Sequence, residues 1–193
     1  MPIYTIIAGV NGVGKSSLSG VLKTERNDLG HIIDVDKIGT ENQCSSIDAG
    51  KIAVKRIRDF LSNGASFSQE TTLSGYLSLK YVKLAKDKGY AVRMFYVGLD
   101  SMNESLSRIH NRVKKGGHDI SPDDVERRYG KRFDDLVKIL PYCNEVRFYD
   151  NENGFLEVGE YRAGELITKG EYRPLWIDEL SKKLRSIYCY DVF

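Results

Sequence analysis

The 193-residue sequence predicts an α/β fold built around a mostly parallel sheet. The first observation is that short apolar runs suited to strands alternate with segments whose apolar residues recur at helical spacing, as in βα units. The second is a glycine-rich loop, GVNGVGKS at residues 9–16, which joins the first strand-like run to the first helix-like segment. Because functional groups gather at the carboxyl ends of parallel strands, this loop marks the edge of the sheet where a site is expected.

The first half of the chain predicts three strands, each followed by a helix. Residues 48–62 carry apolar side chains at i, i+4, i+7 and i+8, which is the pattern of a helix with one buried face. In order, the predicted elements are a strand at 4–8, a helix to about Leu22, a short strand at 31–36 (HIIDVD), the helix at 48–62, a strand at 65–72 with Glu70 at its exit, and a helix marked by Leu77, Tyr81, Leu84 and Ala85.

The second half predicts the remaining strands and an irregular region rich in charge. Residues 90–99 are β-branched and aromatic, as in a buried strand, and Ser101 with Glu104 has the form of a helix capping box. In order, the predicted elements are the strand at 90–99, a helix from the capping box to Lys115, a break at 116–120, a helix from Ser121 to about Leu140, a strand at 145–150, a hairpin about Ala163-Gly164, and a closing helix with Trp176, Leu180 and Leu184.

Composition and charge fit one globular domain spanning residues 1–193. Hydrophobic residues make up 41% of the chain and charged residues 29%, which is ordinary for soluble proteins, and the length suits a single buried core. The formal net charge of only +2 lacks the basic excess that many nucleic-acid-binding proteins have. A nucleic-acid partner is therefore disfavoured.

Cysteine usage and hydropathy favour a cytoplasmic protein. The cysteines at 44, 143 and 189 are far apart and form no Cys-x-x-Cys pair, which argues against a disulfide framework and against a zinc site. No apolar run reaches the length needed to cross a membrane. The apolar residues near the amino terminus run directly into the glycine loop, unlike those of a signal peptide, so we expect no membrane partner.

The glycine loop matches G-x-x-x-x-G-K-[ST] at every fixed position. Glycines let successive backbone N–H groups turn toward one anion, and the amino terminus of the next helix adds a positive dipole. Lys15 should reach the β- and γ-phosphates of ATP, and the Ser16 hydroxyl should ligate Mg²⁺. The alternative is a glycine-rich turn with a surface lysine, but the strand before the loop and the helix after it favour nucleotide binding. The predicted nucleotide-binding residues are Gly9, Asn11, Gly12, Val13, Gly14, Lys15, Ser16 and Ser17.

Three carboxylates are expected near the bound phosphates. Alternation along a strand at 31–36 puts Asp34 and Asp36 on one face, and Glu70 ends the next strand at the same edge. A carboxylate near the γ-phosphate can orient an acceptor hydroxyl and take its proton. We predict that role for Asp36, with Asp34 and Glu70 as substrate contacts or, for Glu70, a contact in the metal shell. The alternatives are that an aspartate caps the following segment, and that Glu70 is a solvated loop charge.

Residues 108–132 predict an arginine-rich helical lid. Arg108 and Arg112 stand at i, i+4 on one helix, and Arg128 and Arg132 on the next. Guanidinium groups can stabilise a transferring phosphoryl group without blocking attack. We expect Arg112 and Arg128 to face the phosphates, whereas a solvated helix face is the alternative for each arginine and the expectation for most.

A Gly116-Gly117 pair between the two lid helices predicts a hinge, and His118 follows it directly. We predict that His118 contacts substrate or the lid backbone. The alternative is an ordinary loop histidine.

Five stretches in this order resemble the zeta toxin family of P-loop kinases, and its short bacterial branch in particular: GVNGVGKSS, HIIDVD, SQETTLSG, RIHNRVKKGGHDISPDDVERRY and WIDELSKKL. The resemblance covers most of the chain and is weakest after Asp150. It implies a three-layer P-loop NTPase fold of the kinase type, with the arginine lid and a small C-terminal hairpin. It also implies phosphorylation of a hydroxyl of UDP-N-acetylglucosamine by ATP, and an antitoxin partner.

Position by position, the resemblance assigns a role to seven residues. It implies Lys15 on the phosphates, Ser16 on the metal, Asp36 as the base, Glu70 and Thr71 as substrate contacts, and Arg112 and Arg128 on the transferring phosphate.

Two departures from the larger zeta toxins concern the acceptor more than the reaction. Ser74 stands where those toxins have an arginine shortly after the glutamate–threonine pair, and the chain is shorter than they are. The sequence therefore predicts an ATP-dependent kinase acting on a small molecule, with a UDP-amino sugar as the leading acceptor. Three other functions stay open: another metabolite kinase, a polynucleotide 5′-hydroxyl kinase, and a nucleotide-binding module without transfer.

Overall fold

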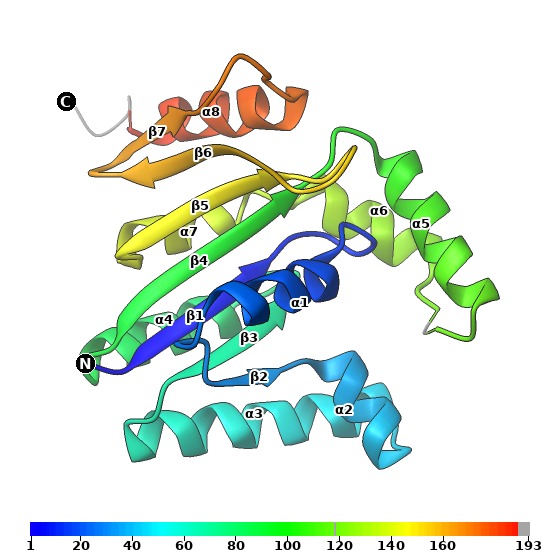
Figure 1. The fold of residues 1–193 in the computed structure, drawn as a ribbon, viewed down its shortest axis with the longest axis vertical. Coiled ribbons are helices and arrows are strands. Elements are labelled where there is room, and N and C mark those ends of the chain that lie inside the picture. Colours follow the sequence, from blue (N-terminus) through cyan, green and yellow to red (C-terminus); the bar gives the residue numbers. More distant parts are fainter. Residues whose placement is uncertain (118, 189–193) are drawn as a thin grey trace.

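A seven-stranded sheet with helices on both faces forms the centre of the protein (Figure 1). The computed structural model describes residues 1–117 and 119–188. The strands are β1 (Ile3–Ala8), β2 (His31–Ile33), β3 (Phe67–Thr71), β4 (Ala91–Gly98), β5 (Glu145–Asp150), β6 (Leu156–Arg162) and β7 (Glu165–Thr168), in the spatial order β2-β3-β1-β4-β5-β6-β7. The first five strands in this order pair in parallel, and β6 and β7 add an antiparallel hairpin. The predicted α/β fold with a mostly parallel sheet and a C-terminal hairpin is confirmed.

The helices pack on the sheet through apolar stripes. The helices are α1 (Lys15–Glu25), α2 (Val35–Asn42), α3 (Ser46–Asn63), α4 (Leu77–Asp87), α5 (Met102–Lys114), α6 (Pro122–Gly130), α7 (Leu136–Ile139) and α8 (Leu175–Tyr188), with a 3-10 turn at Leu140–Tyr142. Helix α1 packs on one face through Leu18 and Leu22, whereas α3, α4, α7 and α8 bury their stripes on the other face. Helices α5 and α6 lie beyond the carboxyl ends of β1 and β4 (Figure 1), where the lid was expected.

Parallel pairing brings the ends of β1, β2 and β3 together. Ala8, the last residue of β1, pairs with Thr71, and Ile33 at the end of β2 pairs with Gln69. Strand β4 is buried along nearly its whole length, which explains why its sequence is a continuous apolar run instead of an alternating one. The loop after β1, the start of α2 and Glu70 consequently lie along one edge of the sheet.

The predicted strand at 31–36 is wrong at its carboxyl end. Strand β2 stops at Ile33, and Asp34 is the N-cap of α2, where its carboxylate accepts hydrogen bonds from the backbone N–H groups of Asp36 and Lys37. An aspartate that caps a helix offers the backbone a local alternative to the strand ladder. Asp36 therefore lies in the first turn of a helix and not on a strand face.

The predicted helix from Ser121 to about Leu140 is wrong because the structure breaks it in two. Helix α6 ends at Gly130, and α7 begins at Leu136 after a turn. Within the turn, the guanidinium of Arg132 lies over the rings of Tyr129 and Phe133, 4.0 and 4.6 Å from their centroids. These stacking contacts hold residues of the turn against the last turn of α6, a tertiary arrangement that helical spacing in the sequence does not encode.

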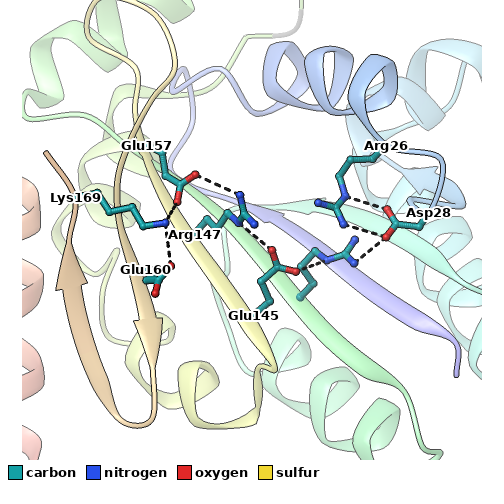
Figure 2. Close-up of polar contacts among 8 residues, drawn as sticks. Arg26, Asp28, Glu145, Arg147, Glu157, Glu160 and Lys169 are labelled. Atoms are coloured by element: carbon teal, nitrogen blue, oxygen red, sulfur yellow. Dashed lines mark hydrogen bonds and ion pairs between the residues drawn. The ribbon is translucent and has the colours of Figure 1, made fainter.

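Ion pairs cross the sheet on the α1 face, beside that helix (Figure 2). Arg93 on β4 donates to Asp28 at 2.8 Å and to Glu145 on β5 at 2.9 Å. The chain of pairs continues through Arg147 to Glu157 on β6. Arg26 and Arg93 hold the pKa of the Asp28 carboxyl well below its usual range, chiefly through hydrogen bonds. This network connects β4, β5 and β6 through charged side chains on the α1 face of the sheet.

Within residues 1–117 and 119–188, no helix combines the length and the apolar character needed to span a bilayer.

Helix α8 is fixed to the sheet by Trp176, which is almost fully buried. Its indole N–H donates to Asp150 at 2.8 Å, and its ring lies against Gly98 at the end of β4. A Cβ at Gly98 would come within 2.2 Å of the indole ring, whereas a Cβ at Gly50 in α3 would meet open space. The two glycines therefore serve different purposes.

We predict opposite effects on stability for the same substitution at these two glycines. Gly98→Ala should lower the free energy of unfolding by about 1–3 kcal/mol, because the new methyl group overpacks Trp176. Gly50→Ala should raise it by about 0.5–1 kcal/mol, because alanine favours a helix interior over glycine. Urea unfolding of both variants measures the difference, and equal changes in the two would contradict the packing described here.

Candidate active site

A cavity of about 650 Å³ opens at the carboxyl edge of the parallel strands. Its walls come from the glycine loop, the end of β3, the start of α2 and the two lid helices. The residues that line it include Asn11, Gly12, Gly14, Lys15, Ser16, Ser17, Asp34, Asp36, Glu70, Thr71, Arg108, Arg112 and Arg128. Most of the residues predicted from the sequence thus line one space.

The glycine loop has a backbone that suits anion binding. Gly12 and Gly14 have φ values of 74° and 98°, a region that only glycine adopts without strain. Gly14 is also the N-cap of α1 and provides no side-chain cap, so the first N–H groups of that helix face the cavity without a capping side chain. Gly9 is packed so tightly that a Cβ there would come within 2.4 Å of the Val97 carbonyl oxygen.

The side chain of Lys15 folds toward its own glycine loop. Its Nζ donates to the carbonyl oxygens of Gly9 and Val10, each at 3.0 Å. Burial lowers the pKa of Lys15 to about 8, and the carboxylates of Glu70 and Asp36 offset part of that effect. A lysine in this state would gain an electrostatic partner if an anion entered the loop.

The Glu70 carboxylate forms hydrogen bonds with side chains of helix α1. Glu70 is 9% exposed and accepts hydrogen bonds from the hydroxyls of Ser16 at 2.7 Å and Ser19 at 2.6 Å. Burial raises the pKa of Glu70, and these hydroxyls act in the opposite direction. The carboxylate thus contacts the residue predicted to ligate the metal, a contact that strand-end reasoning alone did not identify. Ser19 was not singled out from the sequence, although its i, i+3 spacing from Ser16 is a signal that could have done so.

Asp36 lies beside Arg112 in the wall of the cavity. Its carboxylate is half exposed and lies 3.7 Å from a guanidinium nitrogen of Arg112 on α5. Asp34 also lines the cavity, but its carboxylate caps α2. The expectation that both side chains project from one strand face is therefore wrong, although both aspartates line the cavity.

The five lid arginines separate into two groups. Arg127 pairs with Asp124, and Arg132 pairs with Glu179. Arg108, Arg112 and Arg128 line the cavity. Arg108 is held by Glu104 and by the carbonyl oxygens of Asn151 and Glu152.

Arg128 is held by the glycine loop itself. It donates to the side-chain oxygen of Asn11 at 2.9 Å, and the Ser105 hydroxyl donates to the Asn11 carbonyl. The lid and the loop are thereby connected before any ligand binds. Thr71 lines the cavity with its hydroxyl accepting from the N–H of Leu73. The prediction for His118 lies outside the described residues.

A scan against protein-family models finds no match. An uncharacterized protein of Haemophilus influenzae is 34% identical over 126 residues, covering 63% of this chain and 88% of that protein. The chain belongs to the same family as that protein.

Two solved structures have a fold similar to that of this chain. A structure from the PezAT chromosomal toxin–antitoxin system of Streptococcus pneumoniae matches with a TM-score of 0.60 and 18% identity, covering 98% of this chain and 87% of that one. The AvrRxo1-ORF1:ORF2 complex with ATP matches with a TM-score of 0.64 and 18% identity, covering 95% of this chain and 63% of that one. The chain has a zeta-toxin-like P-loop kinase fold.

One further residue of this zeta-toxin-like fold holds the loop from the β5–β6 side. The amide nitrogen of Asn151 donates to the Val13 carbonyl at 2.8 Å and packs on Gly14, where a Cβ would come within 2.5 Å of it. Sequence reasoning missed Asn151, although it directly follows the predicted strand at 145–150, whose carboxyl end lies at the functional edge of the sheet.

We predict that ATP binding is linked to protonation of Lys15. Since the pKa of Lys15 is about 8 in the free protein, a bound triphosphate should raise it and draw in a proton. ATP binding at pH 8 should therefore be accompanied by proton uptake, and ATP affinity should fall as the pH rises above 8. Calorimetric titration in buffers of different ionisation enthalpy measures this uptake. The control Lys15→Arg stays charged and should show none; equal uptake in both proteins would exclude Lys15 as its source.

Proposed function

We propose that this protein is an ATP-dependent phosphotransferase that moves the γ-phosphoryl group of ATP to a hydroxyl of a small molecule. One observation carries the proposal: a single cavity has the phosphate loop on one wall and Asp36 on another, with about 650 Å³ between the walls. A module that only holds a nucleotide has no need of a carboxylate across such a space. The P-loop kinase fold of the structural relatives supports the same reaction class.

The triphosphate would lie in the glycine loop, under the amino terminus of α1. Backbone N–H groups there and the helix dipole attract the anion. The Lys15 ammonium would leave the carbonyl oxygens of Gly9 and Val10 for the β- and γ-phosphates. Arg112 and Arg128 line the same cavity from the lid, where guanidinium groups can stabilise charge on the phosphoryl group as it moves.

The residues present fit Mg²⁺, because hydroxyl and carboxylate oxygens are the ligands it prefers, together with phosphates and water. Ser16 would hold the ion, which when bound neutralises charge on the β- and γ-phosphate oxygens. The Ser16 hydroxyl donates a hydrogen bond to Glu70, so the lone pairs of its oxygen are left free to bind the ion. Glu70 is therefore better suited to orienting Ser16 than to contacting the acceptor.

Asp36 would act as the general base. Its exposed carboxylate can accept the proton of an acceptor hydroxyl as the hydroxyl oxygen bonds to the γ-phosphorus. The bond between the γ-phosphorus and the bridging oxygen breaks in the same step, and ADP leaves with that oxygen. Asp34 keeps α2 in place by capping it and so supports the position of Asp36.

We propose a UDP-amino sugar such as UDP-N-acetylglucosamine as the acceptor, on the basis of the motifs that resemble zeta toxins. We also propose that an antitoxin protein binds this chain. The structures with this fold include a chromosomal toxin–antitoxin system and a complex of two AvrRxo1 open reading frames.

We predict that Asp36→Asn retains ATP affinity but lowers turnover by about 10²–10⁴-fold, because the amide cannot take the hydroxyl proton. The control Glu41→Gln changes an exposed carboxylate of the same helix that pairs with Lys37, and it should leave turnover unchanged. Phosphorylated product is measured by mass spectrometry with UDP-N-acetylglucosamine and with a metabolite extract. Unchanged turnover of the Asp36 variant would move the base to another residue.

A further inference from the structure

Arg128 differs from the other lid arginines in the kind of group that holds it. Each of the others has a carboxylate neighbour: Glu104 for Arg108, Asp36 for Arg112, Asp124 for Arg127 and Glu179 for Arg132. Arg128 donates instead to the side-chain oxygen of Asn11 at 2.9 Å, and the side chain of Asn11 is a neutral amide. In the described part of the chain, no carboxylate forms an ion pair with Arg128. The hydrogen bond to Asn11 therefore orients the guanidinium without neutralising its charge.

The orientation of Arg128 depends on this one hydrogen bond. The Nε of Arg128 is buried without a hydrogen-bond partner. Among residues 1–117 and 119–188, Asn11 is the only hydrogen-bond acceptor that the guanidinium has. Arg128 and Asn11 both line the cavity of the candidate active site. Loss of the Asn11 side chain would consequently release a guanidinium that lies in the wall of this cavity.

Asn11 can hold an arginine because Asn11 is itself fixed. It is 9% exposed, and its backbone carbonyl accepts a hydrogen bond from the hydroxyl of Ser105 on α5, which is buried. Gly12 packs against the same residue, since a Cβ on Gly12 would come within 2.6 Å of the Ser105 carbonyl oxygen. Asn11 thus connects the glycine loop to α5 through its backbone and to α6 through its side chain.

The phosphate-binding motif does not require an asparagine at position 11. This is one of the variable positions of G-x-x-x-x-G-K-[ST], and the backbone N–H groups of the loop can bind phosphates whichever side chain it carries. A carboxylate here would pair with Arg128 and place a negative charge beside a triphosphate. An alanine here would leave Arg128 without an acceptor. An amide orients the arginine and also preserves its charge for a phosphoryl group.

We propose that Asn11 is a positioning residue for phosphoryl transfer, and that its side chain acts through Arg128. This inference rests on the proposed kinase function and names the group that sets the orientation of one lid arginine. Because Arg128 is held beside the loop before ATP arrives, its guanidinium does not have to be ordered as charge develops on the moving phosphoryl group. The Asn11 amide has no contact with the reacting atoms in this role.

Asn11→Ala should lower kcat by about 10–10²-fold, because a misplaced arginine stabilises the moving phosphoryl group poorly. This loss should be smaller than the loss of about 10³-fold or more expected for Arg128→Ala. The KM for ATP should change less than kcat, because the backbone N–H groups of the loop remain. Turnover is measured by mass spectrometry with ATP, Mg²⁺ and UDP-N-acetylglucosamine.

A double variant tests whether Asn11 acts through Arg128. Adding Asn11→Ala to Arg128→Ala should cause no further loss of kcat, because both substitutions remove the action of one guanidinium. The control Asn63→Ala removes an exposed amide at the end of α3 and should match the unaltered protein.

Asn11→Asp separates the neutrality of the amide from its shape. The carboxylate keeps an acceptor oxygen at the same position, but it neutralises Arg128 and repels the triphosphate. This variant should therefore weaken ATP binding more than Asn11→Ala does, and it should not restore kcat. Turnover equal to that of the unaltered protein would overturn the role given to the neutral amide.

A measurement on the free protein tests the inference without turnover. The NMR signal of the Arg128 Nε–H group, assigned by its loss in Arg128→Ala, should report an ordered side chain in the unaltered protein and in Asn63→Ala, and a more mobile one in Asn11→Ala. Equal order in Asn11→Ala would overturn the inference, as would additive losses in the double variant or equal losses of kcat and ATP affinity. If the unaltered protein formed no phosphorylated product, the proposed function would fail, whereas the NMR comparison would still decide how Arg128 is held.

Discussion

The position of the phosphate loop depends on contacts from outside its own motif. Gly12 lies against the backbone of α5, where a Cβ would come within 2.6 Å of the Ser105 carbonyl oxygen. Arg128 bonds to Asn11 from the lid, and Asn151 bonds to Val13 from the loop after β5. These three contacts fix the position of the phosphate loop relative to the lid and to the carboxyl edge of the sheet. The lid arginines therefore already lie next to the loop in the free protein.

In the free site, the charged side chains of Lys15, Glu70 and Asp36 contact other groups of the protein. Lys15 donates to carbonyl oxygens of its own loop, Glu70 accepts from two serine hydroxyls, and Asp36 faces Arg112. Burial of Lys15 and Glu70 disfavours the charged form of each, as the directions of their pKa shifts indicate. Polyphosphate and a divalent cation would supply the missing counter-charges, which gives the site a physical reason to bind both together.

The sequence was informative where local rules and burial agree, as in the run of β4, the Ser101 cap and the turn at Ala163-Gly164. The prediction of the second strand was wrong at Asp34, where two local rules compete. An aspartate suits both the end of a strand and the N-cap of a helix, and in the structure Asp34 caps α2. The break after Gly130 coincides with the stacking of Arg132 on two aromatic rings, a contact that helical spacing does not encode. The link from Glu70 to Ser16 spans 54 residues. Such pairings emerge only when the sheet is assembled.

The central claim is that a triphosphate in the glycine loop faces a carboxylate with room for an alcohol between them. The most direct measurement supplies the protein with Mg²⁺, a metabolite extract and ATP labelled in its γ-phosphate, and follows the label by chromatography and mass spectrometry. This account predicts label in one small organic compound that carries a hydroxyl. Label found only in inorganic phosphate, or left entirely on ATP, would contradict it.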